Sequence, residues 1–385
     1  MSHQHDKEGC RGRDAWLSGP SIEPLQLAGN EHVADLVDNV YARSGFNARR
    51  LAEAAQLVAR MIDDQATIGL TLAGAMTPIG MSGVLISLIE AGFIDVIVST
   101  GANLFHDLAR PFEQPMVQGH HEVDDNALLD DGVARIYDVF ITEEDYILPN
   151  DEAVLRAIKR IDYRQPFSTA TFHHELGRVI LETAPHPEKS LLAAAAKHGV
   201  PIYTSSPGDS VIGLMFVPAY LVDGPVALNP ILDVVELMAI VYGAEKTGAL
   251  EIGGGSPKNF FMQTQPMLQQ MLGHHTKGGH DYFVQLTTDS PHWGGLSGAT
   301  PSEAKSWGKV RDARENNVIV YSCASLTLPL IAQYALARSR PREPRRLMQH
   351  VAELTEKLRR DTRPDAIFAG DQPGNPTFAE VWKKA

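Results

Sequence analysis

Helix-type and strand-type hydrophobic patterns alternate along most of the chain. Residues 49–62 place alanine and large apolar side chains at helical spacing, and residues 66–73 form a short, mostly apolar run typical of a buried strand. Further helices are predicted over residues 80–91, 188–198, 230–243, 258–272 and 345–360. Further strands are predicted over residues 93–100, 201–205, 249–252, 282–288 and 318–322. This alternation predicts an α/β fold, with a Rossmann-like, mainly parallel sheet and helices on both faces.

The chain divides into a short polar start and one long body. Residues 1–24 are polar and contain glycine, so we expect a mobile N-terminal tail. No low-complexity linker interrupts residues 25–385, which predicts a single domain. Ligands of parallel α/β sheets bind beyond the carboxyl ends of the strands. The loops that directly follow the strands are therefore the places to look for chemistry.

Composition narrows the classes of partner. The 385 residues include 34 Lys and Arg against 47 Asp and Glu, a formal net charge of −13, which argues against nucleic acid as the main partner. The N-terminus has no apolar signal-peptide core, and the longest apolar stretches contain acidic residues, so we predict no membrane span. Two cysteines cannot form a disulfide framework. A cytoplasmic protein is the expectation.

Three post-strand loops have the composition of ligand-binding loops. In residues 99–103, small side chains would let backbone amides approach a phosphate or ribose, although a tight turn has the same composition. In residues 252–258, three glycines precede a helix start that carries Lys258, which is either an anion site or a close strand–helix turn. Neither standard glycine pattern for nucleotides is present. In residues 287–290, Asp289 could accept hydrogen bonds from ribose hydroxyls or merely cap a turn.

A fourth loop, residues 298–309, brings candidate reactive groups together. Thr300 or Ser302 is expected to cap a short helix on which Glu303, Trp307 and Lys309 follow closely. A lysine beside a large aromatic ring can lose hydration, which lowers its pKa towards that of a nucleophilic amine. The alternative is an ordinary surface lysine whose stem lies on the tryptophan ring.

Other tempting clusters lack the spacing that their chemistry needs. Residues 120–122 and 173–175 both read His-His-Glu, but adjacent histidines diverge and no known metal-ligand spacing is present, so no metal is predicted. Residues 205–210 have no nucleophile-elbow pattern, and Cys323 lacks the context of a nucleophile.

Several longer motifs resemble one family. They are EAKSWGK at residues 303–309 with SGATP before it, GGGSPK at 253–258, DVIVSTGANLFHDL at 95–108 and DGVARIYDVFI at 131–141. Together they resemble the deoxyhypusine synthase family, closer to its bacterial deoxyhypusine synthase-like branch, over roughly residues 30–340. The resemblance implies NAD as cofactor and a homotetramer with active sites at dimer interfaces. It also implies transfer of an aminobutyl group from spermidine, through an enzyme lysine imine, to a protein lysine or, in related homospermidine synthases, to putrescine.

The resemblance assigns roles to particular residues. Lys309 matches the imine-forming lysine, Glu303 and Trp307 match the amine pocket, and Lys258 matches a lysine of the active-site tunnel. His106 falls beside these as a substrate-binding candidate. The positions that match NAD contacts include Thr100, Gly101, Ala102, Asp209, Gly254, Thr288, Asp289 and Ala324.

Departures from the family pattern concern the acids that would bind a polyamine. Phe105 and His106 stand where the family has two adjacent acids, and Leu214 and Leu296 stand where it has others. Asn259 replaces a histidine, and Cys323 replaces an aspartate. An ammonium group buried without a partner is costly. Three functions therefore stay open: an aminoalkyl transferase, an NAD-dependent oxidoreductase or lyase acting on a less charged amine, and a non-catalytic NAD-binding protein.

Overall fold

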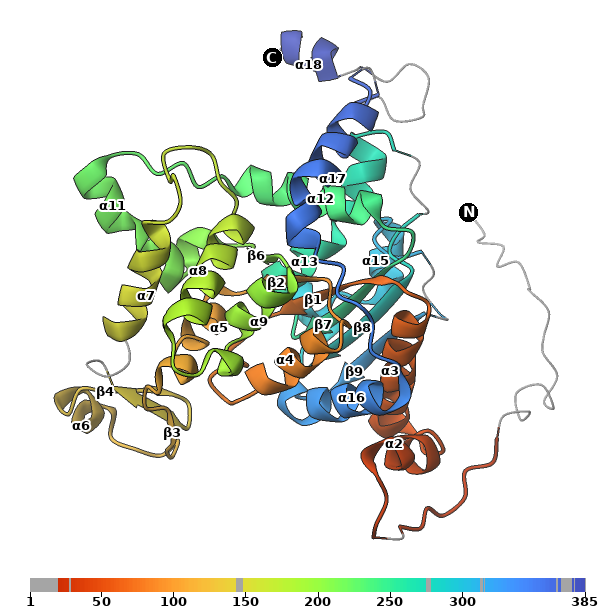
Figure 1. Ribbon diagram of the computed structural model, residues 1–385. Coiled ribbons are helices and arrows are strands. Elements are labelled where there is room, and N and C mark those ends of the chain that lie inside the picture. The colour runs from red at the N-terminus through yellow and green to blue at the C-terminus, as the bar shows by residue number, and fades with distance from the viewer. Residues whose placement is uncertain are drawn as a thin grey trace.

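Figure 1 shows the chain as a computed structural model. The structure describes residues 20–27, 29–142, 148–274, 278–311, 314, 316–364, 366–367, 376 and 378–384. Most of the predicted N-terminal tail, residues 1–19, lies outside these ranges, and residues 20–24 are exposed without helix or strand. The tail and the single-domain division stay predictions.

Six parallel strands form the central sheet, in the order β6-β2-β1-β7-β8-β9. They are β1 (Thr67–Leu72), β2 (Val96–Ser99), β6 (Ile202–Thr204), β7 (Thr247–Ile252), β8 (Tyr282–Thr287) and β9 (Asn317–Tyr321). All six correspond to predicted strands, and the α/β fold class is confirmed. From β1 the chain extends the sheet to one side through β2 and β6, then resumes on the other side of β1 with β7. The strand order therefore reverses between β1 and β7, where sheets of this kind bind ligands.

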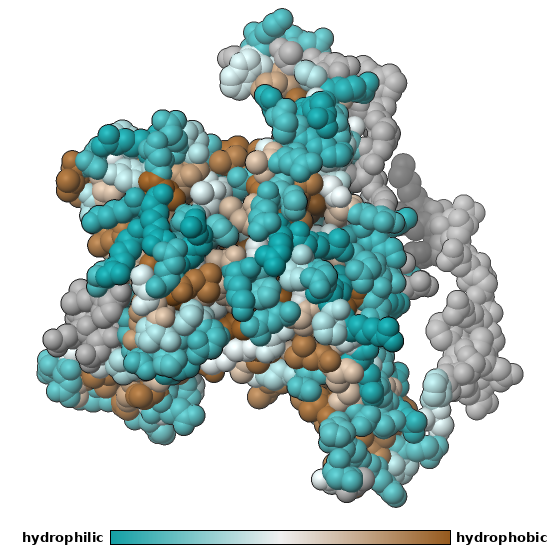
Figure 2. All heavy atoms as spheres, viewed as in Figure 1, coloured by the Kyte–Doolittle hydropathy of each residue, from teal (hydrophilic) through white to brown (hydrophobic). Residues whose placement is uncertain are grey.

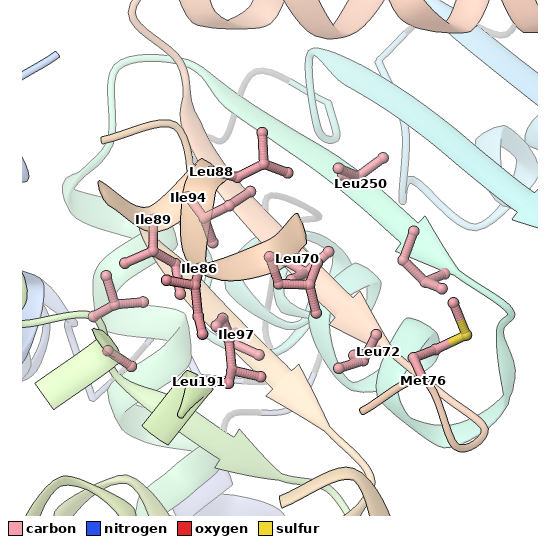
Figure 3. Packing of buried hydrophobic residues seen from close by; sticks show 14 of the residues in the cluster. Leu70, Leu72, Met76, Ile86, Leu88, Ile89, Ile94, Ile97, Leu191 and Leu250 are labelled. Atoms are coloured by element: carbon pink, nitrogen blue, oxygen red, sulfur yellow. The ribbon is translucent and has the colours of Figure 1, made fainter. Parts of the chain in front are cut away.

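Helices cover both faces of this sheet (Figure 1). One face packs against α3 (Phe46–Asp63), α4 (Ser82–Glu90) and α16 (Ala324–Arg338), and the other against α12 (Pro230–Gly243) and α13 (Gly255–Met262). The helix α17 (Leu347–Asp361) packs on α12. Figure 3 shows the first interface, where Leu70 and Ile97 of the strands meet Ile86 and Ile89 of α4. Since successive residues of a strand face opposite sides, β1 presents Leu70 to one helical layer and Thr71 to the other.

Helix starts follow the capping residues. Asn229 accepts hydrogen bonds from the amides of Ile231 and Leu232 at 3.0 and 3.3 Å, and Pro230 is the first residue of α12, as predicted. Ser190 caps α9 (Leu191–His198), so this helix begins three residues later than predicted. The preceding residues 187–189 form a separate 3₁₀ turn.

Two features differ from the sequence expectation. Residues 258–272 are not one helix, because α13 is followed by α14 (Thr264–Pro266) and a π-helical turn (Met267–Met271). Pro266 has no N–H to continue the regular ladder, which accounts for the break. A small antiparallel sheet of β3 (Val117–Gln118), β4 (Val133–Ile136) and β5 (Val139–Thr142) was not expected, since these strands are short and mostly unburied.

The remaining helices complete the layers and two projections. They are α2 (Val33–Leu36), α5 (Gly101–His106), α6 (Asp125–Asp130), α7 (Leu148–Ile158), α8 (Thr169–Thr183), α10 (Val211–Leu214), α11 (Phe216–Asp223), α15 (Pro301–Ser306) and α18 (Phe378–Lys384). In Figure 1, α11 and the small sheet extend to the left of the main sheet. No helix of the described residues is both long and apolar enough to cross a lipid bilayer.

Candidate active site

The loops at the carboxyl edge of the sheet approach one another closely. A Cβ added at Gly101, in the loop after β2, would lie 1.9 Å from Oγ of Ser210, in the loop after β6. A Cβ at Gly254, after β7, would lie 2.4 Å from Cα of Ser297. Both positions therefore need glycine because another loop passes directly against the backbone.

Where the strand order reverses, between β1 and β7, two glycines leave an open space that we call the glycine cradle. Gly74 follows β1 and Gly255 follows β7, with φ values of +69° and +60° that favour glycine. A Cβ at either position would meet nothing within 4 Å, so the space before these two backbones is open. Gly255 is also the first residue of α13, so the unpaired amides of the first helical turn begin beside this open space. A pyrophosphate-containing cofactor such as NAD fits residues of this kind.

Asn103 holds two of these loops together. Its buried Oδ1 accepts hydrogen bonds from the amides of Met76 and Thr77 at 2.7 and 3.3 Å, and Thr77 Oγ1 donates to the Asn103 carbonyl at 2.6 Å. The loop after β1 is thus fixed to the first turn of α5, where Thr100 occupies the N-cap position.

The predicted cofactor residues lie along this edge of the sheet. Thr100, Gly101 and Ala102 follow β2, and Gly254 follows β7. Three more loops carry the others: Asp209 ends the 3₁₀ turn after β6, Thr288 and Asp289 follow β8, and Ala324 begins α16 after β9. Asp209 and Thr288 are exposed, and Asp289 is partly buried. Their contact with a dinucleotide stays a prediction.

Four of the five predicted catalytic and substrate-binding residues share one pocket. Lys258, Glu303, Trp307 and Lys309 line one small pocket. The rest of its wall consists of Asn259, Met262, Phe283, Leu296, Ala299 and Ala304. The pocket is built by α13, the loop before α15, α15 itself, the segment directly after α15 and one residue of β8. His106 is not among its lining residues.

Lys309 is held as a nucleophilic amine would need to be. Its Nζ donates a hydrogen bond of 2.8 Å to Oδ1 of Asn259. Its amide donates to the Ala304 carbonyl and its own carbonyl accepts from His280, both at 2.9 Å, which fixes the backbone. Partial burial lowers the pKa of Lys309, although the charges of Glu303 and Glu251 oppose this shift. The neutral amine is therefore more populated than for a surface lysine.

Lys258 lies deeper and is almost fully buried. Its Nζ donates to Oε1 of Gln285 and to the Ala299 carbonyl, both at 2.9 Å, and lies 3.8 Å from Oε2 of Glu251. Burial lowers the pKa of Lys258 most strongly, while the charge of Glu251 opposes that shift. The ammonium group also lies 5.3 Å from the ring centre of Phe283.

Two buried polar residues beside the pocket were missed by sequence reasoning. Glu251 of β7 and Gln285 of β8 are partners in register, and both side chains are buried. Burial raises the pKa of Glu251 to about 7. The available signal was a charged residue inside the apolar run of residues 249–252, together with a glutamine inside the next strand. Either would be unusual in a sheet covered on both faces.

The mouth of the pocket is apolar and open. Trp307 and Leu296 line it and are 60% and 48% exposed, respectively. Of the other departures from the family pattern, Leu214 is an exposed residue of α10, whereas Phe105 is a buried residue of α5. Burial lowers the pKa of His106 to about 4, so this imidazole is neutral at pH 7.

The two His-His-Glu segments lie in different settings. His120 and His121 stack on each other at 4.7 Å in the small sheet region. His173 is buried in α8, with Nδ1 2.8 Å from the Ile202 carbonyl oxygen. Across the described ranges, no three His, Cys, Asp or Glu side chains gather as a metal site would require.

A parallel α/β sheet with a glycine cradle at its reversal point, and two lysines of lowered pKa in an adjoining pocket, are features of an α/β enzyme with its site at the carboxyl edge of the sheet. Comparison with known proteins then identifies the family. The deoxyhypusine synthase family model matches residues 35–335. The chain belongs to the deoxyhypusine synthase family.

Individual relatives agree with this assignment. A "Deoxyhypusine synthase-like protein" from Nostoc sp. is 41% identical over 365 residues, covering 92% of this chain and 93% of the relative. A "Probable deoxyhypusine synthase 2" from Methanosarcina acetivorans is 37% identical over 83% of this chain and 90% of the relative. A solved structure described as a "putative deoxyhypusine synthase" from Entamoeba histolytica has a TM-score of 0.54 and 16% identity, with coverage of 84% and 99%. That structure supports the fold.

Proposed function

We propose that this protein is an NAD-dependent transferase that moves an aminoalkyl group from a donor amine to an acceptor amine through an imine on Lys309. The observation that carries the proposal is the partly buried Lys309 amine, held by Asn259 in one pocket with Glu303, Trp307 and Lys258. Membership of the deoxyhypusine synthase family supports the same chemistry.

NAD is proposed to lie in the cradle between β1 and β7. Its phosphates would meet the backbone of residues 253–255 and the start of α13, and the loop that begins with Thr100 would flank it. When bound, its nicotinamide supplies reversible hydride acceptance from the carbon next to an amine nitrogen.

The side chains of the pocket divide the remaining work. The neutral Lys309 amine attacks the imine carbon of the oxidised donor, the C–N bond to the donor nitrogen breaks, and the rest of the donor leaves as a free amine. The aminoalkyl group stays on Lys309 as an imine until the acceptor amine attacks the same carbon and releases Lys309 as the free amine. The carboxylate of Glu303 binds an ammonium group of the substrate. The rings of Trp307 and Phe283 border the carbon chain.

The charges of the pocket limit the kind of amine that fits. Glu251 and Lys258 face each other as an ion pair, which leaves Glu303 to balance a substrate charge once Lys309 is neutral. The mouth beside Glu303 presents Leu296 and Trp307. This arrangement suits an amine with one charged end bound in the pocket and an apolar segment along the mouth.

The exposed leucines support a second candidate, an NAD-dependent oxidoreductase or lyase acting on a less charged amine. Leu296 lines the pocket where the family pattern has an acid. Product analysis separates the candidates. With NAD, spermidine and putrescine, a transferase releases a diamine and forms a longer polyamine, whereas an oxidoreductase accumulates NADH and an aldehyde. If neither product forms although NAD binds, both candidates are wrong and the remaining hypothesis is a non-catalytic NAD-binding protein.

We also propose that the chain assembles, in the homotetramer that the family resemblance implies. The surface of α11 supports association, because Leu221 and Val222 are 76% and 87% exposed and Tyr220 is 57% exposed. Figure 2 shows hydrophobic residues over this projecting part. Large exposed apolar side chains of this kind mark interaction surfaces. Light scattering on the full chain is expected to give four times the monomer mass, and a monomer would contradict the assembly.

A further inference from the structure

Glu251 lies where a carboxylate is costly. It is the penultimate residue of β7, with Thr71 of β1 and Gln285 of β8 as its neighbours in register. Its side chain is 0% exposed, and within the described residues neither carboxylate oxygen has a hydrogen-bond partner. Burying an ionised carboxylate without hydrogen bonds is strongly unfavourable, so packing alone would favour an apolar residue here.

The groups that face Glu251 direct it towards the amine pocket. Lys258 reaches it from α13, with Nζ 3.8 Å from Oε2, and Lys309 acts on it electrostatically from the segment after α15. Thr71 and Gln285, from the flanking strands, are neutral. Gln285 donates to the carbonyls of Gly253 and Ser297 at 2.8 and 2.7 Å, which leaves its Oε1 oriented to accept from Lys258.

We propose that Glu251 is the internal proton acceptor of this pocket, acting through Lys258. The proposal rests on the proposed function, because amine transfer requires it. A substrate nitrogen enters as an ammonium group and must lose a proton before it can form or attack an imine. Lys258 lines the pocket and Glu251 lies directly behind it, whereas Glu303 lies at the open side of the pocket.

The proton transfer balances without any change in oxidation state. An N–H bond of the substrate ammonium breaks and its proton forms an N–H bond on Lys258 Nζ. At the same time, a Lys258 proton moves to Oε2 of Glu251. Lys258 stays an ammonium group, Glu251 becomes a neutral acid, and the substrate nitrogen gains a free electron pair. The reverse transfer recharges the product amine. The 3.8 Å separation is long for a hydrogen bond, as is common before substrate closes a site.

Burial brings the pKa of the proton acceptor, Glu251, close to physiological pH. It raises the pKa of Glu251 to about 7, whereas the charges of Lys258 and Lys309 oppose that rise. Glu303 acts on Lys258 from the other side of the pocket. An acceptor whose pKa lies near the working pH is the efficient choice for proton transfer.

The test compares Glu251→Gln with the wild type and with Asp233→Asn in the full chain. Asp233 is a matched control, since burial raises its pKa to about 7 as well but it hydrogen-bonds Thr169, outside the pocket. With NAD, spermidine and putrescine, wild-type kcat should fall tenfold per pH unit below pH 7. Glu251→Gln should lower kcat by about 100-fold or more at pH 8 and keep the wild-type KM. The decrease of kcat below pH 7 should be absent from this variant. Asp233→Asn should keep the wild-type kcat and its decrease below pH 7.

Three further results decide the proposal. If Glu251→Gln keeps the wild-type kcat and its decrease below pH 7, the proposal is overturned. An increase in KM with unchanged kcat would also overturn it, because that result is expected if Glu251 is only a passive counter-charge. If Glu251→Gln fails to fold, Glu251→Asp replaces it, and we expect a lower kcat that still decreases at acid pH.

If the wild type transfers no amine, the proposed function fails. Infrared pH titration then still tests the pairing, since Lys258→Met should raise the protonation midpoint of Glu251 by more than one pH unit, and an unchanged midpoint contradicts it.

Discussion

At the scale of single residues, the pocket differs from its family pattern at the position next to Lys258. Asn259 stands where the family has a histidine, and its Oδ1 accepts the hydrogen bond from Lys309 at 2.8 Å. An amide oxygen can accept from an ammonium group or from a neutral amine, and it carries no net charge. Asn259 therefore orients the Lys309 amine without adding a charge that would keep it protonated.

Asn259→Asp tests this orientation without changing the shape of the side chain. A carboxylate beside Lys309 stabilises the ammonium form, so the pKa of Lys309 should rise by about one unit or more. Reductive methylation read by peptide mass should show the half-labelling pH of Lys309 moving up by the same amount, with about tenfold slower labelling at neutral pH. Asn126→Asp, on exposed α6, makes the same change elsewhere and should leave the Lys309 profile unchanged. An unshifted profile in Asn259→Asp would sink the assignment.

At the scale of elements, the active site depends on how closely α13 approaches the loop before α15. Gly254 precedes α13 in extended backbone, with φ of −179°, and its missing Cβ makes room for Ser297. Lys258 of α13 then reaches the Ala299 carbonyl in that same loop. The glycines of this segment thus set the relative position of the two lysines in addition to forming the cradle.

Gly254→Ala should disturb both functions of this contact. The new Cβ would lie 2.4 Å from Cα of Ser297, so the loop must shift at a cost of roughly 1–3 kcal/mol. We expect a lower Tm together with weaker NAD binding, measured by thermal unfolding and calorimetry. Gly83→Ala in α4 is the control, because a Cβ there meets nothing within 4 Å and alanine favours a helix. Equal Tm and NAD affinity in both variants would contradict the close-approach argument.

The sequence predicted the sheet better than it predicted the pocket. All six parallel strands were visible as apolar runs, because strands covered on both faces have few polar positions. The family motif brought Lys258 together with Lys309. It gave no indication of Glu251 or Gln285, since which strands adjoin, and which of their residues lie side by side, follows from topology. The break at Pro266 was missed because helical periodicity continues through it.

At the scale of the whole molecule, buried ionisable groups make stability depend on pH in opposing ways. Burial raises the pKa of Asp107 to about 6 and of Asp233 to about 7, and lowers the pKa of His173 and His280 to about 4. The carboxyl groups favour the folded state most at low pH, whereas the histidines favour it most above pH 6.5. Differences between variants isolate each contribution.

Asp233→Asn isolates one of these groups. Folded Asp233 keeps its proton up to about pH 7, whereas the unfolded chain releases it near the ordinary value of 3.8. The free energy of unfolding of the wild type should therefore fall relative to the variant as pH rises from 4 to 7. The slope should be on the order of 1 kcal/mol per pH unit. Denaturant titrations at several pH values measure it, and a difference that stays constant with pH would show that Asp233 is ionised throughout.

The proposed imine between Lys309 and the transferred aminoalkyl group can be trapped by reduction. The full chain is incubated with NAD and spermidine, reduced with borohydride and digested for peptide mass analysis. We expect an aminoalkyl adduct on Lys309 that requires both NAD and the amine and is absent from Lys309→Arg. An adduct on a different lysine, or none with any di- or polyamine although NAD binds, would contradict it.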